Sequence, residues 1–152
     1  MQILRKLMQE TKVTLMYWGL SLFIFLALIP WVLSPTIALQ SIQVMAAYGS
    51  IVLAFLSGSV WGWENKLSNN QNLWNAIGFS LLAVGVALLS ISYLSISLIF
   101  LAVSLQLFFI FEKKNSKHFH ANIKYANARN LITNLVTICC ITSLAFIFNP
   151  YT

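Results

Sequence analysis

Five long apolar runs divide this chain, and no other feature constrains its fold as strongly. They occupy roughly residues 13–33, 42–63, 73–92, 94–111 and 131–148. A helix needs about 20 apolar residues to cross the hydrocarbon core of a bilayer, because each residue advances it by about 1.5 Å. None of the runs alternates apolar and polar residues as the strands of a membrane barrel do. The sequence therefore predicts an all-α polytopic membrane protein, a bundle of five transmembrane helices that forms one domain over residues 1–152.

The composition is typical of a membrane protein and includes few carboxylates that could act in acid–base catalysis. Hydrophobic residues make up 59% of the chain and charged residues only 8%, with a mean hydropathy of +0.81. Both values lie far outside the range of ordinary soluble domains. The chain has no aspartate, and its three acidic residues are Glu10, Glu64 and Glu112. No nucleotide-binding loop or catalytic triad can be assembled, so the sequence predicts no cofactor and gives an enzymatic activity no support without excluding it.

The basic residues predict how the chain is threaded. All nine fall in segments that a five-span chain places on one side of the membrane: Arg5, Lys6, Lys12, Lys66, Lys113, Lys114, Lys117, Lys124 and Arg129. Basic loops remain in the cytoplasm, so we expect a cytoplasmic N-terminus and a C-terminus outside. The net charge of +6 then reflects topology and contact with the anionic inner leaflet, and nucleic acid is not an expected partner.

Residues 112–130 form the one long connection, and we expect it to be a basic cytoplasmic loop. The alternative is a short interfacial helix whose Phe119 and Ile123 dip into lipid. His118 and His120 lie in this segment, but two imidazoles without cysteine or carboxylate neighbours fall short of a metal site. Cys139 and Cys140, within the last span, are expected to act as small apolar fillers.

Small residues recur at every fourth position of the second span, which has the sequence "YGSIVLAFLSGSVWGWE" over residues 48–64. The stripe begins one turn earlier and consists of Ala46, Ser50, Ala54, Gly58 and Gly62. Helices in membranes associate through close packing at such residues. The stripe predicts that span two is the central packing helix, and a homodimer interface or the lining of a conduit are the alternatives.

Four polar residues fall in the inner half of the predicted bundle: Glu64, Asn75, Gln106 and Asn134. A buried amide needs a hydrogen-bond partner, so we expect Gln106 and Asn134 to bond to each other or to Ser and Thr across the bundle, near Glu64 and Trp61. Two interpretations follow, which are bonds that only link helices and a shallow pocket open to the cytoplasm.

The second span resembles the signature of an uncharacterised membrane family, the domain of unknown function 3429, which includes transmembrane protein 69. The likeness rests on Tyr48, Gly49, Leu53, Phe55, Leu56, Gly58, Trp61 and Gly62, and on "LIPW" at 28–31 and "RNLIT" at 129–133. Ser57 and Val60 depart from the pattern, where many members carry a glycine and a basic residue or histidine. The resemblance implies a small multi-pass protein of bacterial or mitochondrial inner membranes, here a bacterial one, and it implies no activity.

Three functional hypotheses remain open at this level. The first is a non-enzymatic factor that assembles or stabilises other membrane components, with membrane lipids and a membrane protein or a second copy as partners. The second is a small-solute carrier or channel that acts as an oligomer. The third is an enzyme acting on lipid or quinone, which would depend on Glu64, Trp61, Gln106 and Asn134.

Overall fold

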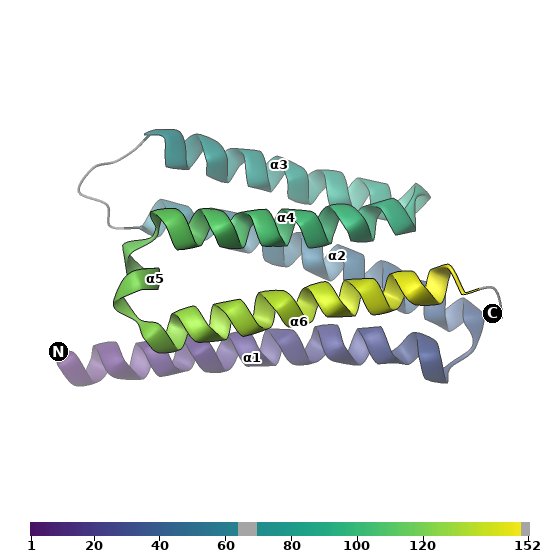
Figure 1. The fold of residues 1–152 in the computed structure, drawn as a ribbon, viewed down its shortest axis with the longest axis horizontal. Coiled ribbons are helices and arrows are strands. Elements are labelled where there is room, and N and C mark those ends of the chain that lie inside the picture. The colour runs from purple at the N-terminus through teal and green to yellow at the C-terminus, as the bar shows by residue number, and fades with distance from the viewer. Residues whose placement is uncertain (64–69, 150–152) are drawn as a thin grey trace.

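The computed structural model describes residues 1–63 and 70–149, and five long α-helices carry the fold of this part of the chain (Figure 1). They are α1 (Gln2–Val32), α2 (Pro35–Ser59), α3 (Asn70–Ser92), α4 (Leu94–Asn115) and α6 (Ile123–Ile147). A 3-10 turn, η1 (Val60–Gly62), extends α2, and the short helix α5 (Lys117–Ala121) joins α4 to α6. No strand occurs in these two described ranges, which confirms the all-α prediction. All five long helices are long and apolar enough to cross a membrane, so the chain is a multi-pass membrane protein.

The helices form a closed ring with two members that touch across its centre. Helix α1 contacts α2, α2 contacts α3, α3 contacts α4 and α4 contacts α6. A contact between α6 and α1 closes the ring. In addition, α2 contacts α4. The described N- and C-terminal ends lie at opposite ends of the bundle (Figure 1). Two helices, α2 and α4, therefore share the central position that the sequence assigned to span two alone.

Short connections between helices enforce the antiparallel arrangement. Ser34 adopts an extended conformation before α2, and Pro35 begins that helix, where a missing N–H costs nothing. Tyr93 alone separates α3 from α4. Across this hairpin, the Ser97 hydroxyl, about one turn after the bend, donates at 2.8 Å to the Val86 carbonyl, about two turns before it.

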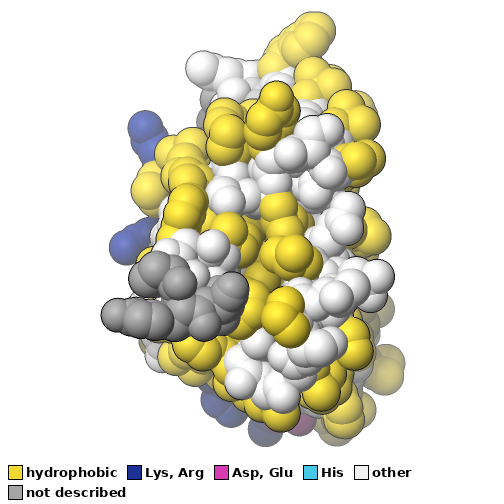
Figure 2. All heavy atoms as spheres, turned by 90° about the vertical axis from the view of Figure 1, so that its right-hand side faces the viewer, with side chains coloured by type: hydrophobic (Ala, Val, Ile, Leu, Met, Phe, Trp, Pro, Cys, Tyr) yellow, Lys and Arg dark blue, Asp and Glu magenta, His cyan; other side chains and the backbone are white. Residues whose placement is uncertain are grey.

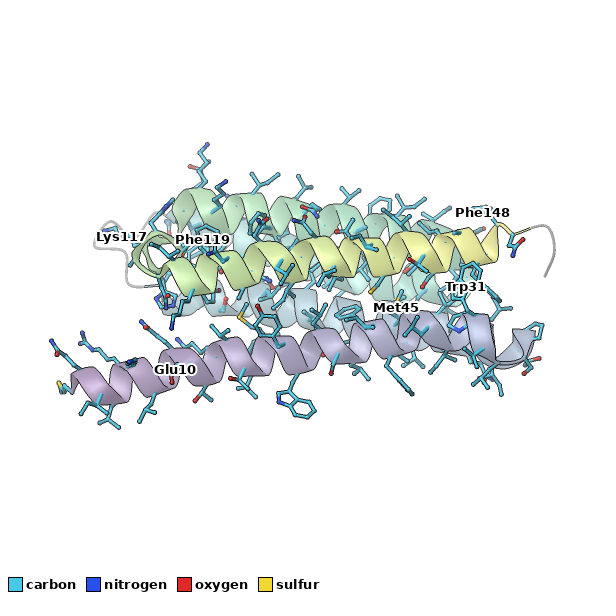
Figure 3. All side chains as sticks on the ribbon, turned by 60° about the horizontal axis from the view of Figure 1, so that its bottom comes forward. Glu10, Trp31, Met45, Lys117, Phe119 and Phe148 are labelled. Carbon is cyan, nitrogen blue, oxygen red and sulfur yellow. The ribbon has the colours of Figure 1, made fainter. Side chains whose placement is uncertain are left out.

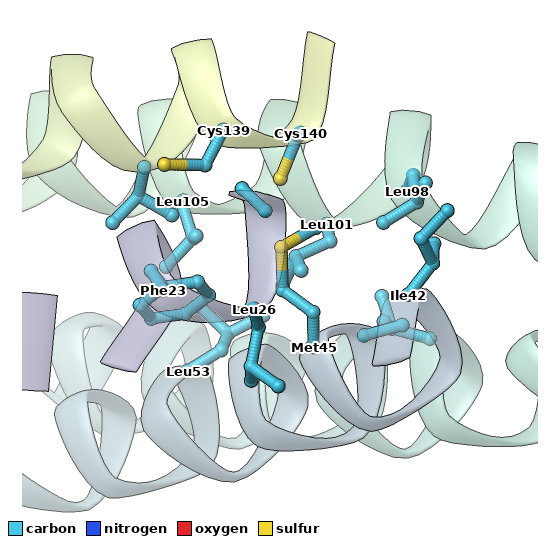
Figure 4. Packing of buried hydrophobic residues seen from close by; sticks show 14 of the residues in the cluster. Phe23, Leu26, Ile42, Met45, Leu53, Leu98, Leu101, Leu105, Cys139 and Cys140 are labelled. Atoms are coloured by element: carbon cyan, nitrogen blue, oxygen red, sulfur yellow. The ribbon is translucent and has the colours of Figure 1, made fainter. Parts of the chain in front are cut away.

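The core consists of interleaved aliphatic, aromatic and sulfur-containing side chains, mainly from α1, α2, α4 and α6 (Figure 4). Met45 lies near the middle of the bundle, and its sulfur accepts a hydrogen bond from Ser143 at 3.8 Å. Cys139 and Cys140 are buried and unpaired in the same cluster. Many large apolar residues face outward on every long helix, as expected where lipid replaces water.

Gly49 permits the close approach of the two central helices. A Cβ atom at this position would overlap the Leu101 side chain of α4, lying 3.0 Å from Cδ1 and 3.2 Å from Cγ. Leu101 is completely buried, so it has little space into which to move. The packing of α2 on α4 therefore requires Gly49, whereas no described atom lies close to the Cβ position of Gly58 or Gly62.

Several helices extend beyond the predicted spans, and the predicted loop at 112–130 is largely helical. Helix α1 begins at Gln2, α4 continues to Asn115 and α6 already begins at Ile123. Side-chain caps explain the added helix: the Ser116 hydroxyl accepts from Phe119 N at 3.4 Å and Asn122 Oδ1 accepts from Tyr125 N at 3.3 Å. Hydropathy detects only the part of a helix that lies in lipid, so it misses polar extensions of this kind.

Candidate functional site at the basic end of the bundle

One end of the bundle carries the described basic residues, and we call it the basic end. Here α1 begins, α4 ends, α5 lies and α6 begins (Figure 1). The eight described cations belong to these elements: Arg5, Lys6, Lys12, Lys113, Lys114, Lys117, Lys124 and Arg129. Lys117 and Phe119 lie at this end, and Trp31 and Phe148 lie at the other (Figure 3). In the view onto the opposite end, yellow apolar side chains alternate with white uncharged side chains and backbone, and dark blue cations show only beyond its outline (Figure 2).

A buried ion pair joins α4 to α6 at the basic end. Arg129 Nε donates to Glu112 Oε2 at 2.9 Å, and the two side chains are only 7% and 3% exposed. The Tyr125 hydroxyl donates to the other carboxylate oxygen, Oε1, at 2.5 Å. Both oxygens of Glu112 are therefore engaged, which compensates for removing its charge from water.

Local sequence places these three side chains together. Glu112 lies in the last turn of α4, because the helix continues past the apolar run that ends at residue 111. Tyr125 and Arg129 are four residues apart, so they project from the same face of α6. The five-residue helix α5 reverses the chain between them and Glu112.

His118 packs beside this cluster from α5. Its ring lies edge-on to Tyr125, with ring centroids 5.0 Å apart. The Nε2 atom is buried and has no hydrogen-bond partner among the described residues. Burial lowers the pKa of His118, and the positive charge of Lys12 lowers it further, whereas the Glu112 carboxylate raises it. The neutral imidazole is thus favoured in this setting.

Phe119 anchors α5 to the bundle. It is buried, and its ring contacts Phe109 at 5.7 Å and Tyr125 at 6.4 Å between centroids. Ile123, in contrast, is 74% exposed. The short helix considered as an alternative at 112–130 is therefore present, but Phe119 packs against protein and not into lipid.

A second polar group lies deeper in the bundle, about 9 Å along α4 from Glu112. Gln106 Nε2 donates to Thr137 Oγ1 at 2.9 Å and, over a longer distance of 3.4 Å, to Asn134 Oδ1. Asn134 Nδ2 in turn donates to Asn130 Oδ1 at 3.2 Å. The bond expected between Gln106 and Asn134 is present, with a threonine as the closer partner.

The other predicted members of the inner polar cluster do not join this group within the described structure. Glu64 lies outside the described residues. Asn75 is exposed on α3 and bonds to no side chain that the structure describes, and Trp61 is exposed beyond the end of α2. Of the four predicted residues, the structure brings together Gln106 and Asn134.

The small-residue stripe of α2 divides into two halves. Ala46 and Ser50 are buried in the bundle, whereas Ala54, Gly58 and Gly62 are exposed. The division follows from helix geometry, since positions four apart drift by about 40° per step around the helix. Only the first half faces neighbouring helices of the same chain.

The motif residues divide in a similar way. Tyr48 is half-buried and donates to the Gly19 carbonyl at 3.3 Å, and Gly49 is buried against α4. Phe55, Gly58, Trp61 and Gly62 point outward. The motif therefore combines packing contacts at its start with an exposed surface at its end.

The comparison with protein families is consistent with the motif in α2. A model of the family described as "Protein of unknown function (DUF3429)" matches residues 8–145. The chain belongs to this family. The match includes all or part of each of the five long helices. The function of DUF3429 is unknown, so membership of the family assigns no activity to the chain. Neither the comparison with curated proteins nor that with solved structures finds a match.

Sequence reasoning missed the cluster of Glu112, Tyr125 and Arg129 because it placed all three in a loop. Two signals were available in the sequence. A lone carboxylate follows directly after an apolar run, and Asn122 stands three residues before Tyr125 as a helix cap. The arrangement supports a cross-link between helices, since both carboxylate oxygens are bonded to side chains of α6.

Proposed function

We propose that this protein is a non-enzymatic factor that assembles or stabilises other components of its membrane. The observation that supports the proposal most is the exposed second half of the α2 stripe. Glu112, Tyr125 and Arg129 at the basic end are bonded to one another, whereas this surface of α2 lacks a neighbour within the described chain.

The exposed face of α2 suits a transmembrane helix of another protein. Ile51, Ala54, Phe55 and Gly58 follow the spacing i, i+3, i+4 and i+7, so they share one face, and all four are exposed. A Cβ atom at Gly58 would meet nothing within 4 Å. A partner helix that crosses at Ala54 and Gly58 can approach the backbone closely, while the large side chains of Ile51 and Phe55 pack on its flank.

We further propose that the protein lies in the bacterial inner membrane with its basic end in the cytoplasm. The support is the gathering of the eight described cations at that end. Cytoplasmic segments carry the excess of Lys and Arg, and the anionic inner leaflet attracts them by about 1 kcal/mol for each residue near the surface.

The test is to extract the protein in native-lipid nanodiscs and to weigh the intact assembly by mass spectrometry. Wild type is compared with Gly58→Leu and with the matched control Gly78→Leu, which alters a glycine of α3 that also has open space around it. We expect a second membrane protein in fixed ratio with wild type and Gly78→Leu, and its loss with Gly58→Leu.

Other compositions of the assembly would overturn the proposal. A closed homo-oligomer that conducts a solute in proteoliposomes would favour a carrier or channel. A retained lipid or quinone that the assembly converts would favour an enzyme. A partner that persists with Gly58→Leu would exclude this face of α2 as the contact.

A further inference from the structure

Among the buried side-chain nitrogen and oxygen atoms of the described chain, Nε2 of His118 is the one that the fold leaves without a hydrogen-bond partner. Its Nε2 atom is sealed from solvent and makes no hydrogen bond to a described residue. Nearly all buried polar atoms in proteins have a partner, so an exception calls for a physical reason. A neutral imidazole tolerates this position, because only one of its two nitrogens carries a proton and Nε2 can be the nitrogen without one.

Every element that packs around His118 contributes a charged or titratable group. Lys12 acts on it from α1 and Glu112 from α4. Tyr125 of α6 faces its ring, and Arg129 of the same helix is bonded to Glu112. On α5 itself, Lys117 precedes His118 and His120 follows, and both are exposed.

We propose that His118 is a proton-binding site that controls whether α5 remains packed on the basic end of the bundle. A proton taken up from water makes both ring nitrogens donors, so the buried Nε2–H then requires an acceptor. The nearby carboxylate of Glu112 already accepts from Tyr125 and Arg129. No described group stands in hydrogen-bonding position to Nε2, so a protonated His118 leaves a buried donor unsatisfied until the ring moves into water.

The remaining charges favour departure of the ring. The Lys12 ammonium repels an imidazolium, and the ion pair of Glu112 with Arg129 has little net charge with which to hold it. Phe119, the next residue, is the buried anchor of α5, so movement of His118 into water withdraws the anchor as well. Acidification thus releases α5 and exposes Tyr125 and the ion pair behind it.

Hydrogen exchange measures this release directly. Protection factors of amides 117–125 are determined by mass spectrometry for the full chain in nanodiscs, at about pH 7.5 and about pH 5.5. The opening equilibrium should shift by up to about tenfold per pH unit below about 6.5, the pKa of a free imidazole. We expect protection of this segment to fall on acidification, while protection of the α2 core amides stays constant.

Two matched variants test whether His118 is responsible. His118→Phe keeps a ring against Tyr125 but cannot bind a proton, so its protection should not depend on pH in this range. His120→Phe alters the exposed histidine of the same helix and should respond to pH as wild type does. Constant protection in wild type, or a response that survives in His118→Phe, would overturn the proposal.

A second measurement on wild type does not depend on the folding of a variant. Nuclear magnetic resonance of the two labelled histidine side chains yields a pKa for each. We expect His118 to bind its proton below about pH 6.5, the pKa of a free imidazole, and its protonation to change the signals of Tyr125. A His118 that titrates at or above about pH 6.5, or without effect on Tyr125, would refute the assignment.

Discussion

Replacing Glu112 by glutamine removes the negative charge of the buried pair and leaves the Arg129 guanidinium buried without its counter-ion. Loss of one partner from a buried pair costs about 3–5 kcal/mol. Glutamine keeps one oxygen that can accept from Arg129 or Tyr125, so we expect the low end, about 3 kcal/mol, which is roughly a 100-fold change in the unfolding equilibrium.

The assay is equilibrium unfolding in mixed micelles of a mild detergent and dodecyl sulfate, followed by tryptophan fluorescence. Glu10→Gln is the matched control, since Glu10 lies exposed on the first turns of α1 and its loss should change stability by less than about 0.5 kcal/mol (Figure 3). Combining Glu112→Gln with Arg129→Met removes both charges, and we expect this double variant to be more stable than Glu112→Gln alone.

Two results would refute this reasoning. A Glu112→Gln protein as stable as the Glu10→Gln control would mean that the pair is not desolvated. A double variant whose loss equals the sum of the single losses would mean that the two side chains do not interact in the folded protein.

Three further variants or conditions probe other parts of the bundle. Gly49→Ala should lower the free energy of unfolding by about 1–3 kcal/mol in the same micelle assay, because its Cβ overlaps Leu101, whereas Gly58→Ala should be neutral. Equal effects of the two variants would contradict the close approach of α2 and α4. Gln106→Leu should lower the free energy of unfolding by about 0.6–1.7 kcal/mol, the range of single interhelical hydrogen bonds in membranes, and should leave the mass of the extracted assembly unchanged. Unchanged stability together with a changed assembly would instead indicate a pocket. Burial lowers the pKa of His118 in the folded chain, so its contribution to stability is complete above about pH 6.5 and declines as the pH falls toward the pKa of the folded state. Melting temperatures measured between about pH 7.5 and about pH 5.5 should therefore fall on acidification. A melting temperature that rises on acidification would contradict this sign.

The sequence by itself determined the number of spans, the helical class, the gathering of cations in α1 and the α4–α6 connection, and the family. Each of these properties is local, because a run of about 20 apolar residues has one stable conformation in lipid wherever its neighbours lie. The hydrogen bonding of the Gln106 amide was also predictable from the sequence. Any amide at that depth in the membrane needs a partner, and few polar groups were available to it.

Tertiary structure alone decided which polar groups meet at the basic end. Glu112 lies 13 residues from Tyr125 and 17 from Arg129, and their contact depends on the reversal of the chain at α5 and on the packing of α4 against α6. The same packing decides that Gly49 faces a neighbour while Gly58 does not, although both lie on α2. A hydropathy pattern describes each helix against lipid, whereas these contacts arise from the rotation of helices relative to one another, which is set by the fit of side chains over the whole bundle.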